Sequence, residues 1–366
     1  GHKTGILWAA AIGACLPDAS AGLECFKGTT PEVVSAAERL IEAGAVGVEV
    51  DPSKEELWID CAVARAKGRG RTVISMDHTN VVLVERDGEA VLKGEAEAPS
   101  ERSDLRRELA CMTLGELVGI ARTADEAARR RLEEGVALNM RIARHGLTLF
   151  PKRFVDLASD EELTTVAKLV CAGVYARMSG EDFPVMSLAG SGNKGIVASV
   201  PMAAHAENKG KVPRETAQAL ALACLVTSAT TFHLGSLSAV CGCSNAAGIG
   251  LACGLVLLEG GGEKEISLAI NNMVGNVTGM ICDGAKIGCA LKTMTAVDAA
   301  FRASSLALEG IGIPFTDGIV GSSGLESLAN LGRIAGRGML SADSEILSIM
   351  KEKLESEKSR PRGGKG

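Results

Sequence analysis

The sequence predicts an α+β amino-terminal domain with an antiparallel sheet, followed by a mainly all-α, Ala/Gly-rich helical domain. Apolar residues alternate with a period of two between residues 46 and 92, which indicates strands. A helical period and capping signals take over from about residue 105 to 355. Only 3% of the residues are aromatic whereas 44 are glycine, so we expect helices that approach one another closely.

The chain of 366 residues is too long for one typical core and, at 46% hydrophobic, too apolar for a disordered protein. A charged, proline-containing stretch at residues 96–105 marks the first boundary, and the end of the chain is basic with Pro and Gly. We therefore expect four units: an α+β domain at 1–100, a helical connection at 101–150, an all-α domain at 151–350 and a disordered tail at 351–366.

Local signals predict the elements of the first domain in order. A small-residue helix is expected over residues 6–15, and a second helix begins at Pro31 with Thr30 as its cap. Alternating valines at 46–50 and alternating apolar residues at 57–63 predict strands. Asp87-Gly88 between two apolar runs predicts a tight hairpin turn.

Capping boxes predict helix starts in the second half of the chain. The spacing of a hydroxyl residue followed three positions later by glutamate occurs at Thr113, Thr123 and Ser159. Residues 216–258 carry no Asp, Glu, Lys or Arg, but Thr, Ser, Gly, Asn and a histidine interrupt them. Helices buried on all sides in a core explain this stretch better than a membrane span.

Charge and cysteine usage exclude several classes of function. A net charge of −6 provides no basic field for nucleic acid or an anionic membrane surface. The odd number of cysteines, 11, is spread over a large chain, which does not fit a secreted disulfide framework. We expect a reducing, cytoplasmic compartment, a small-molecule partner, and no nucleic-acid or membrane partner, with a homo-oligomer as an open alternative.

Four cysteines stand out as candidate metal ligands, because thiolates bind iron–sulfur clusters and soft metals. Seven residues of continuous helix between Cys282 and Cys289 would separate them by about 10 Å, so Gly284 and Gly288 are expected to break the helix. Cys241 and Cys243 would point about 200° apart on a helix, so a three-cysteine site is as natural as a four-cysteine one. Buried cysteines that act as small apolar residues are the alternative.

A glycine-rich turn and a histidine segment are the other candidate site elements. Residues 190–195, Gly-Ser-Gly-Asn-Lys-Gly, precede an apolar run, and their backbone amides could bind a carboxylate or phosphate. They lack the spacing of the common nucleotide-binding loops, so a plain helix-entry turn is the alternative. His78, near a strand end, is a candidate for carboxylate binding or proton transfer, or a hydrogen-bonded structural residue.

Together these segments resemble the iron–sulfur L-cysteine desulfidase family, which is related to the alpha part of iron–sulfur L-serine dehydratases. The resemblance rests on SAVCGC at 238–243, ICDGAKIGCALK at 281–292, MSLAGSGNKGI at 186–196 and DHTN at 77–80. It covers nearly the whole chain, including the opening helix. The Cys-Thr-Glu-Pro segment with which family members usually begin, and whose cysteine is assigned as the base, is absent.

The resemblance implies an iron–sulfur lyase that eliminates sulfide from L-cysteine to give pyruvate and ammonia without pyridoxal phosphate. It implies a 4Fe-4S cluster held by Cys282, Cys289 and one of Cys241 or Cys243, of which we favour Cys241. It implies substrate binding by a set of eight residues: His78, Thr79, Asn80, Gly190, Ser191, Gly192, Asn193 and Lys194. The proton-abstracting base is unassigned.

Three other functions are kept as alternatives. The nearest is L-serine dehydration with the same cluster chemistry. Another is a truncated or non-catalytic member that retains the fold and binds or senses a ligand. The last is a pyridoxal-phosphate enzyme with Lys194 as the Schiff base, which leaves the cysteine pattern unexplained.

Overall fold

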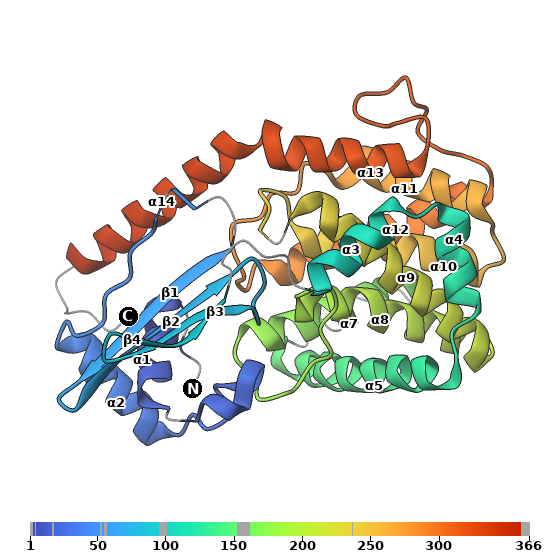
Figure 1. Cartoon of the computed structure of the whole chain (residues 1–366). Coiled ribbons are helices and arrows are strands. Elements are labelled where there is room, and N and C mark those ends of the chain that lie inside the picture. The colour runs from blue at the N-terminus through green and yellow to red at the C-terminus, as the bar shows by residue number, and fades with distance from the viewer. Residues whose placement is uncertain are drawn as a thin grey trace.

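The computed structural model describes residues 3, 5–16, 18–51, 53–54, 57–94, 101–151, 162–235 and 237–359. It has the predicted class: a small antiparallel sheet with helices comes first, and a helical body follows (Figure 1). The predicted cap at Ser159 lies outside the described residues, as do residues 96–100 of the expected boundary.

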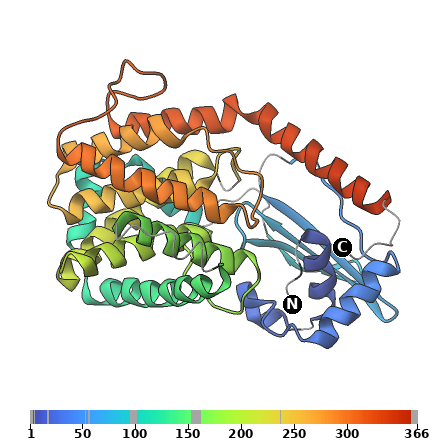
Figure 2. The ribbon, with the colours of Figure 1, turned by 180° about the vertical axis from the view of Figure 1, so that it is seen from behind.

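The amino-terminal part begins with two helices and a short 3-10 segment: α1 (Ile6–Cys15), η1 (Ala19–Glu24) and α2 (Pro31–Glu42). Thr30 caps α2 as predicted, because its hydroxyl accepts a hydrogen bond from the Val33 amide. Seen from opposite sides in Figures 1 and 2, α1 lies over one face of the sheet. The two helices bury a small core of their own.

The sheet has four antiparallel strands in chain order: β1 (Trp58–Arg65), β2 (Gly68–Ser75), β3 (Val81–Arg86) and β4 (Glu89–Lys93). Asp87 and Gly88 form the predicted tight turn, and both have positive φ angles, as the primed hairpin turns require. The predicted strand at 46–50 does not form. Only Val46 packs against the helices there. Val48 and Val50 are 41% and 68% exposed, so the alternating valines do not bury one face of a strand.

The helical body begins earlier than predicted. Residues 101–150 form three helices, α3 (Glu101–Cys111), α4 (Leu114–Arg122) and α5 (Glu126–Leu149), that pack into the same core as the later helices. They are part of the body and not a connection, because each buries apolar residues against it. The remaining helices of the body are α7 (Glu162–Met178), α8 (Gly192–Asn208), α9 (Pro213–Leu234), α10 (Gly242–Leu258), α11 (Glu263–Val277), α12 (Cys289–Leu308) and α13 (Gly324–Arg333).

Two local predictions in this region have different outcomes. Thr113 and Glu116 form the predicted capping box at the start of α4. Thr123 does not cap α5, because the Asp125 carboxylate stands next to the first helical residue and accepts from the Ala128 amide. A short π-helical segment, η2 (Ile334–Gly338), leads into the last helix, α14 (Leu340–Ser359). Residues 351–359, which were expected to belong to a disordered tail, are therefore helical.

Small residues let the helices of the body approach closely, as composition predicts. A Cβ atom at Gly146 of α5 would lie 2.0 Å from the Ala172 carbonyl oxygen of α7. At Gly250 of α10 it would lie 2.4 Å from the Ala223 oxygen of α9. Helix α9 is long and apolar enough to cross a membrane by composition alone, but most of that stretch is buried among neighbouring helices, as in a core helix.

Candidate functional site

The two cysteine segments lie side by side although Cys241 and Cys282 are 41 positions apart in the chain. The Cys241 amide donates a hydrogen bond of 2.8 Å to the Met280 carbonyl, and the Cys282 amide donates one of 2.8 Å to the Ala239 carbonyl. These two bonds form a short antiparallel bridge outside the sheet. The backbone therefore holds Cys241 and Cys282 near each other, where the segment after α11 meets the amino end of α10.

Cys289 returns to the same place because the chain between it and Cys282 is not helical, as predicted. Gly284 has a φ of +94°, a left-handed conformation that favours glycine. The Lys286 amide donates to the Cys289 sulfur over 3.5 Å, and this thiol lies 3.6 Å from the Gly284 carbonyl oxygen. The loop thus folds back onto Cys289, which is the first residue of α12.

Cys241 and Cys243 do not point apart. Cys241 is the N-cap of α10 and lies outside the helix, so the helical spacing does not apply to this pair. The two thiols are hydrogen-bonded to each other. The Ser244 hydroxyl donates to the Cys241 sulfur over 3.4 Å, and the Cys243 sulfur lies 3.6 Å from the Ser191 hydroxyl. All four cysteines of the sequence prediction therefore lie at one site.

The environment separates the acidities of these thiols. The hydrogen bond from the Cys243 thiol, together with that from Ser244, lowers the pKa of Cys241 despite its burial. The same bond and burial raise the pKa of Cys243 well above its ordinary value. Burial also raises the pKa of Cys282. Cys241 is thus the thiol of this pair that ionises first, and the thiolate is the form that binds metals.

The glycine-rich turn forms the next wall of the site. Two backbone hydrogen bonds of 3.0 Å between Leu188 and Ser191 close it, and Ala189 and Gly190 at its tip both have positive φ angles. Ser191 caps α8, because its hydroxyl accepts from the Lys194 amide over 3.4 Å. The contact between Ser191 and Cys243 then brings the amino end of α8 to that of α10. Helix amino termini favour negative charge, so this corner of the protein suits anions.

Two cations lie beside this turn, Lys194, which is buried, and Arg177, which is partly buried. The Lys194 ammonium donates to the Thr231 hydroxyl over 2.9 Å and to the Ala189 carbonyl over 3.3 Å. Burial lowers the pKa of Lys194 to about 8, although the nearby thiols oppose that shift. The Arg177 guanidinium donates to the Asn193 amide oxygen over 3.1 Å. Neither cation has a carboxylate partner within the part of the chain that the structure describes.

A third cation binds the cysteine loop. The Lys292 ammonium lies 2.5 Å from an Asp283 carboxylate oxygen and donates to the Ile281 carbonyl over 2.9 Å. It therefore ties α12 to the loop that carries Cys282. Its positive charge also lowers the pKa of Cys241.

The sheet contributes the turn between β2 and β3. His78 is exposed there, and its Nδ1 lies 3.8 Å from the place where a Cβ of residue 190 would be. Thr79 instead bonds through its amide and hydroxyl to Asp77, and the Asn80 amide donates to the Ser75 carbonyl. Of the three predicted sheet residues, His78 approaches the glycine-rich turn, whereas these contacts of Thr79 and Asn80 hold their own turn together.

Cysteine thiols are soft donors of the kind that hold iron–sulfur clusters. Over the described ranges, no three His, Cys, Asp or Glu side chains are arranged to bind one metal ion. A single ion draws thiolates to about 2.3 Å from one point, whereas a cluster distributes them over separate irons. Cys282 lies close enough to Cys241 and Cys289 for both to raise its pKa. Soft thiol donors beside cations fit an anionic cluster.

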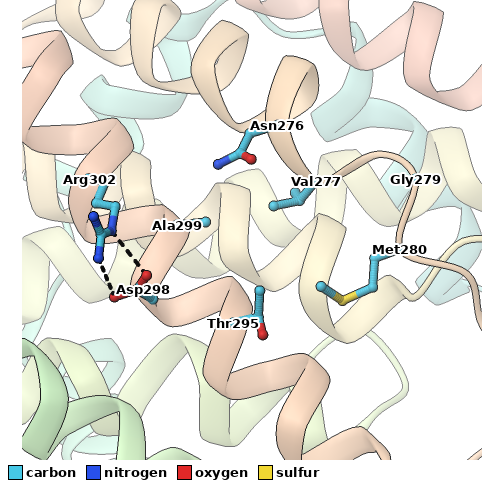
Figure 3. A pocket seen from close by; sticks show the side chains of 8 residues that line it. All are labelled: Asn276, Val277, Gly279, Met280, Thr295, Asp298, Ala299 and Arg302. Carbon is cyan, nitrogen blue, oxygen red and sulfur yellow. Dashed lines mark hydrogen bonds and ion pairs between the residues drawn. The ribbon is translucent and has the colours of Figure 1, made fainter.

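The structure also has a surface hollow that adjoins this site at Met280, whose carbonyl accepts from the Cys241 amide. It has a volume of about 430 Å³ and lies between the end of α11 and the middle of α12 (Figure 3). Asp298 and Arg302 pair across its edge. It is lined by Asn276, Val277, Gly279, Met280, Thr295, Asp298, Ala299 and Arg302, none of which is a predicted site residue.

The structure is a mainly helical protein with an amino-terminal sheet, and its candidate site brings cysteine thiols and cations together at helix amino termini. The chain belongs to the serine dehydratase alpha chain family, whose pattern matches residues 20–348. Membership indicates a lyase-type enzyme of amino-acid metabolism. No solved structure matches the chain.

Three curated relatives carry the name UPF0597 protein. The one from Caldanaerobacter subterraneus subsp. tengcongensis is 37% identical over 96% of this chain and 84% of its own length. Those from Oleidesulfovibrio alaskensis and Geobacter sulfurreducens are 38% and 36% identical, over 96% and 98% of this chain and 83% and 85% of their own lengths.

Sequence reasoning missed two charged residues at the site, Arg106 and Arg177, and it named Asp77, the ion-pair partner of Arg106, only as part of the DHTN segment. Arg177 follows the apolar run Val-Cys-Ala-Gly-Val-Tyr-Ala in α7, and a charge at the end of such a run is a signal for a buried polar role. Arg106 gives no such signal, because it lies in a helix rich in charged residues. Only its position against the sheet sets it apart.

Proposed function

We propose that this protein is an iron–sulfur-dependent lyase that converts L-cysteine to pyruvate, ammonia and sulfide in the cytoplasm. The observation that supports this most is the assembly of Cys241, Cys282 and Cys289 beside the glycine-rich turn, with the Lys194 ammonium close by. These three cysteines would hold a 4Fe-4S cluster. When bound, such a cluster with one open iron supplies a Lewis acid for the leaving sulfur.

The residues of the chain orient the substrate and move its protons. The turn at residues 190–193 provides backbone N–H donors for the substrate's carboxylate, at the positive end of α8. Two nitrogen bases lie beside this turn, at His78 and Lys194. Removal of the Cα proton by one of them and departure of the sulfur leave aminoacrylate, which adds water and loses ammonia to give pyruvate.

L-Serine is the second candidate substrate, because the matching family is described as serine dehydratase alpha chain. The elimination has the same form, with water lost in place of sulfide. A thiolate leaves more easily than hydroxide, so the serine reaction needs stronger assistance at the leaving group. The ratio of kcat/KM for the two amino acids decides between them.

The test is iron and acid-labile sulfide on protein purified without oxygen, followed by assays of pyruvate and sulfide from L-cysteine. We expect stoichiometric iron and sulfide, an absorption spectrum that L-cysteine perturbs, and equal yields of pyruvate and sulfide. Protein that takes up no iron on anaerobic reconstitution would contradict the proposal. A covalent pyridoxal adduct that forms on borohydride reduction with added pyridoxal phosphate, and that Lys194→Met does not form, would then support the Schiff-base alternative.

His78→Ala and Lys194→Met distinguish the two candidate bases. Loss of hydrogen–deuterium exchange at the substrate's Cα in one variant, with iron content unchanged, identifies the base. Lys93→Ala is the control, because Lys93 is exposed on β4 of the same sheet.

A further inference from the structure

Backbone strain is concentrated where the sheet meets the helical body. Three non-glycine residues among those described have positive φ angles: Met76, Asp87 and Ala189. Asp87 is explained by the hairpin turn. The other two precede Asp77 and Gly190, on the two turns that face each other across this boundary. Residues in such conformations cost about 1–3 kcal/mol each and are enriched at ligand sites, so this boundary is where a ligand is to be sought.

Arg106 of α3 lies at the meeting of these two turns. Its Nη2 is 3.5 Å from an Asp77 carboxylate oxygen and 3.6 Å from the place where a Cβ of residue 190 would be. The side chains of Arg106 and Asp77 are only 12% and 6% exposed. The glycine at 190 therefore leaves open backbone directly in front of a guanidinium that the protein has buried and fixed.

Among the described residues, the Lys and Arg side chains near the turn outnumber the carboxylates that pair with them. Lys194 lies on the other side of the turn, close enough for Arg106 to disfavour its charged form. Asp77 is the carboxylate that pairs with Arg106, whereas Lys194 and Arg177 bond to neutral groups, as far as the described residues extend. The turn thus has an excess of positive charge. A bound carboxylate would relieve it, and a guanidinium binds a carboxylate with two parallel hydrogen bonds.

We propose that Arg106 binds the α-carboxylate of the amino-acid substrate over Gly190 and that Asp77 is the positioning residue that holds Arg106 there. This inference rests on the proposed function for the class of ligand. It gives the sheet a specific task, since Asp77 belongs to the turn between β2 and β3 and Arg106 to the helical body. Amines that lack the carboxylate are then poor ligands.

The experiment measures binding of L-alanine and of ethylamine by calorimetry to the protein and to Arg106→Met. L-Alanine has no leaving group, and ethylamine is the same molecule without its carboxylate. We expect the protein to prefer L-alanine, and Arg106→Met to weaken L-alanine binding by about 10-fold to 100-fold without affecting ethylamine. For turnover we expect a higher KM and a nearly unchanged kcat. Arg86→Met is the control, since Arg86 is exposed on β3.

A charge exchange separates ligand binding from a structural ion pair. Asp77→Arg with Arg106→Asp keeps opposite charges across the boundary, so it restores the melting temperature if the pair only joins the two parts. Our proposal expects L-alanine binding to stay lost in it, because a carboxylate at position 106 repels the ligand. Arg106→Lys keeps the charge without the two-pronged donor geometry, and we expect an intermediate affinity.

Three results would overturn the inference. The protein could bind L-alanine and ethylamine equally well, or Arg106→Met could bind L-alanine as tightly as the unchanged protein. The third is recovery of L-alanine binding in the double variant with Asp77→Arg and Arg106→Asp. If Arg106→Met does not fold, unchanged L-alanine binding in Arg106→Lys would overturn the inference instead. The proposed function fails separately. Arg106-dependent binding of L-alanine without turnover of cysteine or serine would contradict the lyase and leave this inference standing.

Discussion

The helical body and the amino-terminal part differ in how much of their chain is buried. The body has one continuous core from α3 to η2, in which helices such as α10 are buried almost on every side. In the amino-terminal part, the core around α1 and α2 has three buried residues, and every residue of β4 is exposed. The site takes its cysteines and most of its cations from the body and only one turn from the sheet.

This difference indicates that the two regions have different roles at the site. Groups that must hold a reactive centre in place lie on rigid, buried helix ends, where neighbouring elements fix each thiol. The sheet contributes Asp77 and His78 on a turn that meets the body at its surface. We therefore expect changes in the body to affect cofactor content and stability, and changes in the sheet to affect substrate binding and proton transfer.

The largest effect is expected for Cys282→Ser. Removal of one of three thiol ligands should abolish iron content and turnover, because a serine hydroxyl is a poor ligand for iron. Iron analysis after anaerobic reconstitution measures this. Cys61→Ser on β1 is the matched control in the amino-terminal part, where Cys61 is exposed. Full iron content in Cys282→Ser would refute the ligand assignment.

The matching change in the sheet is His78→Ala. We expect unchanged iron content and a fall in kcat/KM of about 100-fold, the size typical of a lost acid–base or orienting group. Steady-state assays together with iron analysis test both parts. Loss of iron in this variant would contradict the division between the two regions.

Glycine substitutions compare the packing of the two regions directly. Gly250→Ala should lower the free energy of unfolding by about 2–3 kcal/mol, because its Cβ would lie 2.2 Å from the Thr227 hydroxyl and 2.4 Å from the Ala223 oxygen. Gly13→Ala in α1 meets no atom within 4 Å. It should instead stabilise the protein by up to about 1 kcal/mol through helix propensity. Urea denaturation measures both, and equal effects would contradict the packing difference.

The smallest effect concerns pH. Burial alone would raise the pKa of Glu259, but hydrogen bonds from Lys211 and His205 lower it below the ordinary value of 4.5. The unfolded state then binds more protons, so this stabilisation is present above about pH 4.5 and is lost as pH falls through the folded pKa. Glu259→Gln should remove less than about 1 kcal/mol of it. Thermal denaturation from about pH 6 to pH 3 tests this.

An equivalent pair exists in the sheet, where a hydrogen bond from Arg71 lowers the pKa of Asp60. The pKa is again lowered, so the destabilisation caused by Asp60→Asn should also disappear at low pH. We expect a smaller effect than for Glu259, because the Asp60 side chain is 38% exposed and solvent screens the pair. A larger effect in the sheet than in the body would reverse the comparison.

Sequence patterns predicted the elements whose cause is local. The cap at Thr30, the box at Thr113 and the turn at Asp87 each depend on neighbours within four residues, and each is confirmed. The strand predicted at 46–50 failed because alternation forms a strand only where a partner strand and a buried face exist. The cap predicted at Thr123 failed because Asp125 offers a closer acceptor to the same helix.

The sequence by itself determined which residues can do chemistry: the four cysteines, the glycine-rich turn and the histidine. Tertiary structure decided how they meet. It paired the segments of Cys241 and Cys282, and it moved Cys241 out of the helix to a cap, so that two thiols expected to diverge face each other. It also brought Arg106 of α3 against a turn of the sheet. The physical reason is that a pattern reports forces between near neighbours, whereas charge pairing and close backbone approach join residues far apart in the chain.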